Sequence, residues 1–253
     1  MADMILVNIN PAYRAQELKY ALNKVQCSVL MMVTSVKTSD YDIMLKEIAP
    51  EIEKCRSGEL KSEALPHLRY VVKMDNKIDK ARAFTPISEI YELGDNGSSI
   101  IHLDNIEAQI KPEDTTNIQF TSGTTGSPKA ATLSHFSILN NGWLVSERLR
   151  YTAEDKILCS VPLYHCFGMV LSNMAAITNG CEVLFPSAVF DAEISMKVGS
   201  EKKATSIYGV PTMFLEYLRI LKKHPGKYDL SAARTGIMAG SICPKPVKPY
   251  FNL

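Results

Sequence analysis

The chain carries near its middle the run Thr121-Ser122-Gly123-Thr124-Thr125-Gly126-Ser127-Pro128-Lys129. The run combines hydroxyl side chains with two glycines, a proline and a lysine, and it contains no large apolar residue. An apolar segment at 117–120 leads into it, and a helical pattern that begins near Ser134 follows it. Glycines let backbone N–H groups approach an anion, hydroxyls donate hydrogen bonds, and the lysine adds positive charge. The run therefore predicts a phosphate-binding loop between a strand and a helix.

Two other interpretations of this loop fit the residues less well. The spacing differs from that of the ordinary P-loop, G-x-x-x-x-G-K-[ST]. Gly123 and Gly126 are only three positions apart, and Ala130 stands where the P-loop has its metal-binding hydroxyl. A flexible Ser/Thr/Gly linker has a similar composition. A single lysine directly after a proline is not linker chemistry, so phosphate binding is the better interpretation.

The loop, with Phe120 before it, resembles the AMP-binding signature of the adenylate-forming superfamily. That superfamily contains acyl-CoA synthetases, firefly luciferases and the adenylation domains of peptide synthetases. Three other segments agree with it in order and spacing: residues 7–14, residues 162–168, which resemble its P-L-[FY]-H-x-x-G element, and residues 236–241, which resemble the strand end that lines its adenine site. Across the whole chain, the sequence is most similar to the medium-chain acyl-CoA ligases of this superfamily.

This resemblance implies a fold and a reaction. The fold would be α/β, with mainly parallel sheets flanked by helices, and the chain would form an incomplete N-terminal domain of the adenylate-forming fold. The reaction would join a fatty acid to AMP with release of pyrophosphate, after which the thiol of CoA would take the acyl group. ATP and Mg²⁺ would be the cofactors, with magnesium bridging the phosphates, and CoA would be a co-substrate.

The resemblance also assigns roles to individual residues. The ATP phosphates would be bound by Thr121, Ser122, Gly123, Thr124, Thr125, Gly126, Ser127, Pro128 and Lys129. The adenine ring would pack against Ala239, Gly240 and Ser241, because small residues at a strand end let a ring approach the backbone. The substrate pocket would include His165 at its acyl and α-phosphate end, and Val210 in the wall of the acyl tunnel.

Each of these smaller assignments has a structural alternative. The segment Ala239-Gly240-Ser241 is also compatible with an ordinary tight turn. His165 alone would more simply be a partly buried histidine that hydrogen-bonds to the backbone, although its P-L-Y-H-C-F-G context favours the pocket. It is not assigned as a catalytic base. Val210 could simply belong to the hydrophobic core.

The chain lacks several strings that complete the active site in this superfamily. It contains neither the Tyr-Gly-x-Thr-Glu segment nor the Thr-Gly-Asp segment, and the catalytic lysine of the family's small C-terminal domain is absent, so no catalytic residue is assigned. We therefore expect residues 1–253 to be a partial AMP-binding domain without its N-terminal start, its C-terminal part and the small C-terminal domain. Adenylation needs both substrates held in one geometry and a stabilised α-phosphate, so we expect the chain alone to have little or no ligase activity.

Two other functions remain open at this point. One is an adenylating enzyme that transfers the activated acid to a different acceptor, such as the thiol of a carrier protein. The other is a truncated, non-catalytic product that binds a nucleotide or a partner without turnover.

Composition sets outer bounds on function. The 253 residues are 46% hydrophobic and 22% charged, which is typical of a globular chain. The net charge of +1 argues against a nucleic-acid partner, and no apolar run is long enough for a transmembrane segment. The six cysteines have no zinc-like spacing and predict buried, reduced thiols in an intracellular compartment. Residues 1–20 show no presequence, although the resemblance implies a mitochondrial location.

Strand and helix patterns alternate along the chain, which independently predicts an α/β fold with a mainly parallel sheet. Strands are expected over 4–9, 28–33, 68–72, 157–161, 182–185, 205–210 and 234–239. Helices are expected over 14–25, 40–55 with a break at Pro50, 134–149, 191–203 and 211–223. Residues 94–99 read as a turn, and the one candidate for a domain boundary is 94–117.

Overall fold

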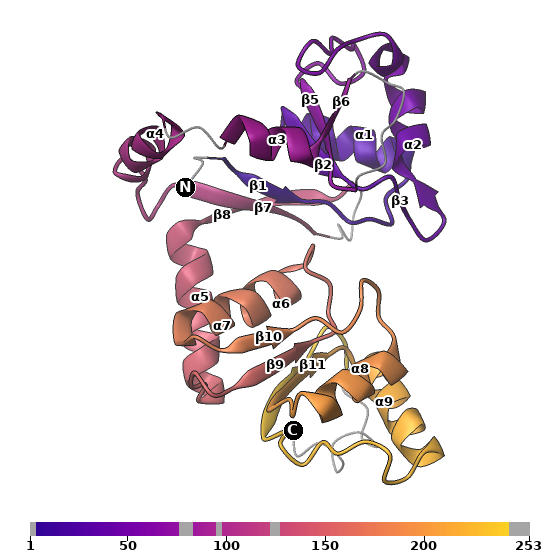
Figure 1. Cartoon of the computed structure of the whole chain (residues 1–253), viewed down its shortest axis with the longest axis vertical. Coiled ribbons are helices and arrows are strands. Elements are labelled where there is room, and N and C mark those ends of the chain that lie inside the picture. Colours follow the sequence, from indigo (N-terminus) through magenta and orange to yellow (C-terminus); the bar gives the residue numbers. More distant parts are fainter. Residues whose placement is uncertain (1–3, 76–82, 95–97, 122–126, 243–253) are drawn as a thin grey trace. The chain divides into compact units, whose positions relative to one another are not determined.

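The computed structural model describes residues 4–75, 83–94, 98–121 and 127–242, with the backbone alone for 98–102 (Figure 1). The chain divides into two compact units, unit 1 (Met1–Thr132) and unit 2 (Leu133–Leu253). The boundary expected at 94–117 is wrong. Strand β7 (Thr115–Thr121), which follows that segment, pairs in parallel with β1 (Leu6–Asn8) near the start of the chain. This long-range pairing keeps the segment inside unit 1.

Unit 1 is built on short sheets. Its strands are β1, β2 (Val29–Met32), β3 (Ser35–Val36), β4 (Ser39–Asp40), β5 (Tyr70–Lys73), β6 (Phe84–Pro86), β7 and β8 (Lys129–Ser134), the last of which runs past the unit boundary. One sheet has the order β1-β7-β8, and a second has the parallel order β2-β5-β6. Strands β3 and β4 form a short antiparallel pair. The strands predicted at 4–9, 28–33 and 68–72 are confirmed.

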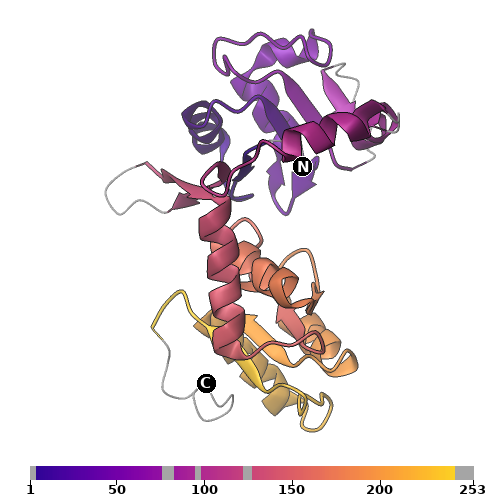
Figure 2. The same ribbon diagram turned by 90° about the vertical axis from the view of Figure 1, so that its left-hand side faces the viewer.

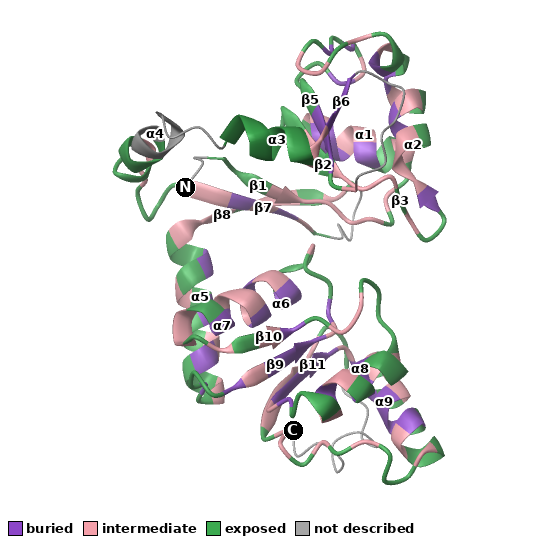
Figure 3. Cartoon of the chain, in the orientation of Figure 1, coloured by how far each residue is buried: buried purple, intermediate pink, exposed green. Residues whose placement is uncertain are grey.

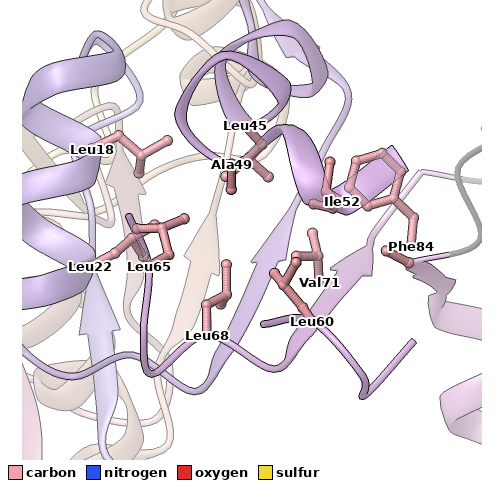
Figure 4. Close-up of a cluster of buried hydrophobic side chains, with 11 residues drawn as sticks. Leu18, Leu22, Leu45, Ala49, Ile52, Leu60, Leu65, Leu68, Val71 and Phe84 are labelled. Atoms are coloured by element: carbon pink, nitrogen blue, oxygen red, sulfur yellow. The ribbon is translucent and has the colours of Figure 1, made fainter. Parts of the chain in front are cut away.

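The described part of unit 1 also contains helices. They are α1 (Ala15–Lys24), α2 (Tyr41–Ile48), the 3₁₀ turn η1 (Pro50–Glu53), α3 (Ile87–Gly94) and α4 (Ser98–Glu107). The core of this unit collects side chains from α1, α2, η1, β5, β6 and the loops between them (Figure 4). The predicted break at Pro50 is confirmed, because α2 ends before it and Pro50 opens η1. Of the turn expected at 94–99, Gly94 ends α3 and residues 98–99 begin α4, while 95–97 lie outside the described residues.

Unit 2 contains a four-stranded sheet in which every described strand pair is parallel. Its strands are β9 (Lys156–Cys159), β10 (Glu182–Leu184), β11 (Ser206–Gly209) and β12 (Thr235–Met238), in the order β10-β9-β11-β12. Buried residues are concentrated in the central strands β9 and β11 (Figure 3). The mainly parallel α/β architecture and the four strands predicted for this part of the chain are confirmed.

Helices cover both faces of this sheet (Figures 1 and 2). They are α5 (His135–Leu149), α6 (Cys166–Gly168), the π-helical turn η2 (Met169–Met174), α7 (Ala175–Asn179), α8 (Ala192–Glu201) and α9 (Pro211–Lys223). Helices α8 and α9 pack on one side, where Leu158 and Ile207 point. Residues of α5, α6 and α7 pack on the other side, around Ile157 and Tyr208.

The predicted helix starts in unit 2 are confirmed by their caps. The Ser134 side chain accepts a hydrogen bond from the Ser137 N–H at 3.1 Å, and Asp191 accepts one from the Ile194 N–H at 2.8 Å. Pro211 opens α9, where its missing N–H costs nothing. The segment from α6 to α7 was not predicted as helical.

Helix α5 packs very closely on the segment η2–α7. At Gly142, an added Cβ would lie 2.6 Å from Met174 Cβ and 2.8 Å from the Met174 carbonyl carbon. A side chain at this position cannot be accommodated without a shift of the backbone.

We expect Gly142→Ala to lower the free energy of unfolding by about 1–3 kcal/mol, the usual cost of overpacking a close contact. Urea unfolding followed by circular dichroism would measure it. Gly94→Ala is the matched control, because nothing lies within 4 Å of an added Cβ at Gly94. Equal stability of the two variants would contradict the close packing.

A buried carboxylate ties the sheet of unit 2 to the end of α5. Asp155, only 3% exposed, accepts hydrogen bonds from Arg234 Nε at 3.0 Å and from Thr205 Oγ1 at 2.6 Å. The Arg234 guanidinium also donates to the carbonyls of Leu149 and Arg150 at the end of α5. Although burial alone raises the pKa of Asp155, the hydrogen bonds from Arg234 and Thr205 hold that pKa below its ordinary value.

We expect Asp155→Asn to lower the free energy of unfolding at neutral pH by about 2 kcal/mol. The loss should be smaller than that caused by breaking a fully buried ion pair, because the Arg234 side chain is partly exposed to solvent. The carboxylate's contribution is present above its ordinary pKa of 3.8 and is lost as the pH falls through its lower folded pKa. The stability difference between the two proteins should therefore shrink in acid. Fluorescence of Trp143 in α5 would report unfolding.

Glu182→Gln provides the control for this experiment. It changes a carboxylate to an amide in the exposed pair with Lys156, whose charged atoms are 3.3 Å apart. Exposed pairs contribute at most about 1 kcal/mol, so its stability should change little. A loss for Asp155→Asn no larger than for Glu182→Gln would argue against the buried network.

Candidate functional site

The two ends of the predicted phosphate loop lie on neighbouring strands. Strand β7 ends at Thr121, and β8 begins at Lys129 in the same sheet. Thr121, Ser127 and Lys129 are exposed, while Pro128 is half-buried. Five of the predicted phosphate ligands lie outside the described residues: Ser122, Gly123, Thr124, Thr125 and Gly126. The exposed lysine at the start of β8 is available to an anion.

The helix predicted from Ser134 is confirmed, but the strand that precedes it was not predicted. Residues 129–134 form strand β8 beside β7, and α5 begins only at His135. A helix dipole attracts anions only within its first turn. The phosphate binding predicted for this loop would therefore depend on backbone N–H groups, hydroxyls and Lys129, without help from a helix N-terminus.

Two tyrosines near the start of the chain contact the ends of the loop. The Tyr20 hydroxyl, on α1, donates a hydrogen bond to the Pro128 carbonyl at 3.1 Å. The ring of Tyr13 contacts the ring of Phe120 edge-on, with centroids 6.5 Å apart. Tyr20 was not among the predicted site residues, because only the fold brings this helix to Pro128.

Buried amides fix the strand that leads into the loop. Asn117 is 2% exposed, and its Nδ2 donates to the Leu6 carbonyl at 2.8 Å and to Asn8 Oδ1 at 2.7 Å. Gln119 Nε2 donates to Asn117 Oδ1 at 2.9 Å. Because buried polar groups must be hydrogen-bonded, a one-residue slip of β7 against β1 would be costly. The network thus fixes where Thr121 ends the strand.

The other predicted site residues gather at one edge of the sheet of unit 2. Val210 directly follows β11, Ala239 directly follows β12, and His165 lies on the segment that follows β9. The carboxyl ends of parallel strands meet at the same edge, which is where open α/β sheets bind ligands. The fold therefore brings these three predicted segments together within unit 2.

The backbone after β12 lies against the residue after β11. The Ala239 N–H donates to the Gly209 carbonyl at 3.3 Å. Gly240 has φ +93°, and an added Cβ there would lie 3.2 Å from Val210 Cγ1. The positive φ fits the tight-turn alternative, and it is compatible with the adenine assignment because Gly240 and Ser241 are exposed. Val210 is half-buried beside the core cluster.

His165 is exposed and caps the short helix α6. Its Nδ1 accepts a hydrogen bond from the Phe167 N–H at 3.1 Å, so the neutral ring carries its proton on Nε2. The alternative was a partly buried histidine that hydrogen-bonds to the backbone. The hydrogen bond is present, but the side chain is exposed, so the burial was predicted wrongly. The turn before α6 requires Gly168, because an added Cβ would lie 2.4 Å from the Pro162 carbonyl oxygen.

The thiols differ in their exposure. Cys159 in β9 is buried, whereas Cys166 is exposed beside His165, with Sγ 3.7 Å from Nδ1. The prediction of buried thiols is therefore confirmed for Cys159 and wrong for Cys166, which lies at the sheet edge. Within the described ranges, no group of three or more His, Cys, Asp and Glu residues is placed to hold a metal ion. None of the helices in those ranges has the length and apolar character needed to cross a bilayer.

Comparisons with known proteins agree with this architecture. A family model described as AMP-binding enzyme matches residues 1–252. The chain is 38% identical over 247 residues to the mitochondrial medium-chain acyl-CoA ligase ACSF2 of Bos taurus, covering 96% of this chain and 39% of that protein. It is 39% identical over 248 residues to the Danio rerio ACSF2, covering 97% of this chain and 40% of that protein. The chain thus spans about two fifths of the length of these relatives.

Solved structures share the fold at lower identity. The anthranilate CoA ligase AuaEII, in complex with anthranoyl-AMP, matches with a TM-score of 0.74 at 21% identity, covering 98% of this chain and 44% of that one. The long-chain-fatty-acid-CoA ligase FadD1 of Archaeoglobus fulgidus matches with a TM-score of 0.69 at 22% identity, covering 96% of this chain and 42% of that one. Together with the family match over nearly every residue, these likenesses establish that the chain belongs to the AMP-binding enzyme family.

Proposed function

We propose that this chain carries the nucleotide- and acyl-adenylate-binding part of an ATP-dependent medium-chain fatty acid–CoA ligase. In that reaction the carboxylate attacks the α-phosphate of ATP and pyrophosphate leaves. The CoA thiol then attacks the acyl carbon and AMP leaves. The proposal rests chiefly on the 38% identity with medium-chain acyl-CoA ligases across 96% of the chain. The names of those relatives also support a mitochondrial location for this chain.

For the phosphates, we propose the hydroxyl-rich loop and Lys129. The support is chemical, because an exposed lysine begins the strand after a loop whose hydroxyls and glycines suit an anion. A magnesium ion would accompany the phosphates, since it prefers oxygen ligands such as those of phosphate, hydroxyl groups and water. The ion would neutralise charge that develops as pyrophosphate leaves.

For the adenine ring and the acyl chain, we propose the edge of the unit 2 sheet. The backbone of Ala239, Gly240 and Ser241 would contact the adenine, and Val210 would contact the acyl chain. His165 presents its Nε2–H at the same edge and would donate to an oxygen of the acyl phosphate. This role uses hydrogen bonding and does not require the ring to change protonation.

Calorimetric titration of the 253-residue chain with ATP and with a sulfamoyl analogue of octanoyl-AMP tests the proposed function. Acid-dependent exchange of pyrophosphate into ATP, measured on the same preparation, separates binding from turnover. Binding of either ligand would support the proposal, and exchange in addition would show catalysis by the chain itself. A cooperatively folded preparation that binds neither ligand would rule the proposal out.

We expect Lys129→Ala to weaken the binding of both ATP and inorganic tripolyphosphate by about tenfold, the loss of one charge-assisted contact. Isothermal titration at low ionic strength would measure the two dissociation constants. Lys111→Ala is the matched control, since Lys111 is equally exposed in unit 1 and lies outside the loop. A similar change in both variants would indicate a general effect of charge instead of a phosphate contact.

Gly240→Ala should weaken the binding of ATP but not of tripolyphosphate. The added Cβ is strained at φ +93° and contacts Val210, which would shift the backbone proposed to face adenine. Gly226→Ala controls for strain alone, because Gly226 has φ +75° with nothing within 4 Å of an added Cβ. Unchanged ATP affinity in Gly240→Ala would favour the tight-turn interpretation.

A further inference from the structure

A chain of buried hydroxyls runs through the core of unit 2 beneath the sheet edge. The Tyr151 hydroxyl lies 2.6 Å from Ser206 Oγ and donates to the Tyr208 hydroxyl at 3.0 Å. The Tyr208 hydroxyl in turn donates to the Leu171 carbonyl at 2.9 Å. Tyr208 and Ser206 are 0% exposed, and Tyr151 is 6% exposed. This series of hydrogen-bonded hydroxyls therefore ends on the Leu171 backbone carbonyl.

The direction of donation along this chain is determined by its last bond. A carbonyl only accepts, so the Tyr208 proton goes to Leu171, the Tyr151 proton goes to Tyr208, and Ser206 donates to Tyr151. Burial raises the pKa of Tyr151 to about 12 and also raises that of Tyr208. Both phenols therefore keep their protons at neutral pH, and the donation to Leu171 is permanent.

The accepting carbonyl belongs to an unusual turn. Leu171 lies in the π-helical turn η2, which continues directly from α6, the helix capped by His165. A π-helix bonds i to i+5, and single π-turns inside helices are frequent at functional sites. The Tyr208 hydroxyl supplies a donor to this widened turn from the neighbouring strand β11.

Tyr208 also contacts α6, which directly precedes this turn. Its ring lies 5.8 Å from the ring of Phe167, at an interplanar angle of 35°. Phe167 is the residue whose N–H donates to His165 Nδ1. One buried side chain thus holds both α6 and the turn, with its ring on Phe167 and its hydroxyl on Leu171. Tyr208 lies on β11, two residues before Val210, which directly follows that strand.

We infer that Tyr208 is a positioning residue, which holds the His165 turn at the carboxyl edge of the unit 2 sheet so that the imidazole faces the bound acyl-adenylate. The inference rests on the proposed function of this edge. The residues packed around the Tyr208 ring are mostly apolar, so a phenylalanine would keep the ring contacts and lose only the hydrogen bonds of the hydroxyl. A buried hydroxyl costs free energy unless it is hydrogen-bonded. When it is bonded, the hydrogen bond fixes the position of its partner, here the Leu171 carbonyl.

The test compares Tyr208→Phe with Tyr151→Phe in the full 253-residue chain. Each substitution removes one hydroxyl from the same buried chain, but only Tyr208→Phe breaks the bond to Leu171. Both should lower the midpoint of thermal unfolding to a similar degree. We expect only Tyr208→Phe to weaken the binding of the sulfamoyl analogue of octanoyl-AMP, by about tenfold in the dissociation constant. Small displacements of a supporting residue have large effects on binding.

Nuclear magnetic resonance of the His165 ring gives a readout that needs no ligand. The His165 signals should shift in Tyr208→Phe and stay unchanged in Tyr151→Phe. If Tyr208→Phe fails to fold, Phe167→Leu tests the ring contact by the same two measurements. Unshifted His165 signals with unchanged affinity would overturn the inference. If the unsubstituted chain does not bind the analogue, the proposed function fails and the His165 signals alone decide whether Tyr208 holds the turn.

Discussion

The parallel pairing of β9, β11 and β12 is the constraint on which the candidate site depends. Ser206 pairs with both Ile157 and Thr235, and the pair Gly209 and Met238 ends β11 and β12 at the same level. Because the strands share one direction, the segments that follow them leave from one edge. Residues that are far apart in the chain meet there through backbone hydrogen bonds, and they need no attraction of their own. The site is therefore a property of the sheet.

Close backbone approach at this edge depends on glycine. At Gly236, inside β12, an added Cβ would lie 2.3 Å from the Ile207 carbonyl oxygen, so the pairing with β11 excludes a side chain on that face. Gly168 has the same role under the Pro162 carbonyl, and Gly240 allows the left-handed turn beside Val210. These three positions explain why the motif strings 162–168 and 236–241 contain glycine. Each glycine serves a different contact in the folded unit.

Local signals in the sequence predict most of the regular elements but not their partners. Ser134, Asp191 and Pro211 mark helix starts because capping depends on neighbouring residues alone. Strand β8 was missed because its six residues become a strand only by lying beside β7. For the site, motif strings identify the loop and His165. Tyr20 and the hydrogen-bonding role of Tyr208 were not predicted, because their partners are distant in sequence.

The hydroxyl of Tyr208 shows how stability and orientation can depend on the same bond. Without a donor, the Leu171 carbonyl would lose a hydrogen bond inside an apolar cluster, at a cost of about 1–3 kcal/mol. An α-helical turn and a π-helical turn both bond their carbonyls internally, so the bond from Tyr208 is an additional one. This bond links η2, and with it the His165 segment, to the neighbouring strand β11. The Tyr208 hydroxyl therefore adds to stability and fixes the place of the turn against β11 through the same bond.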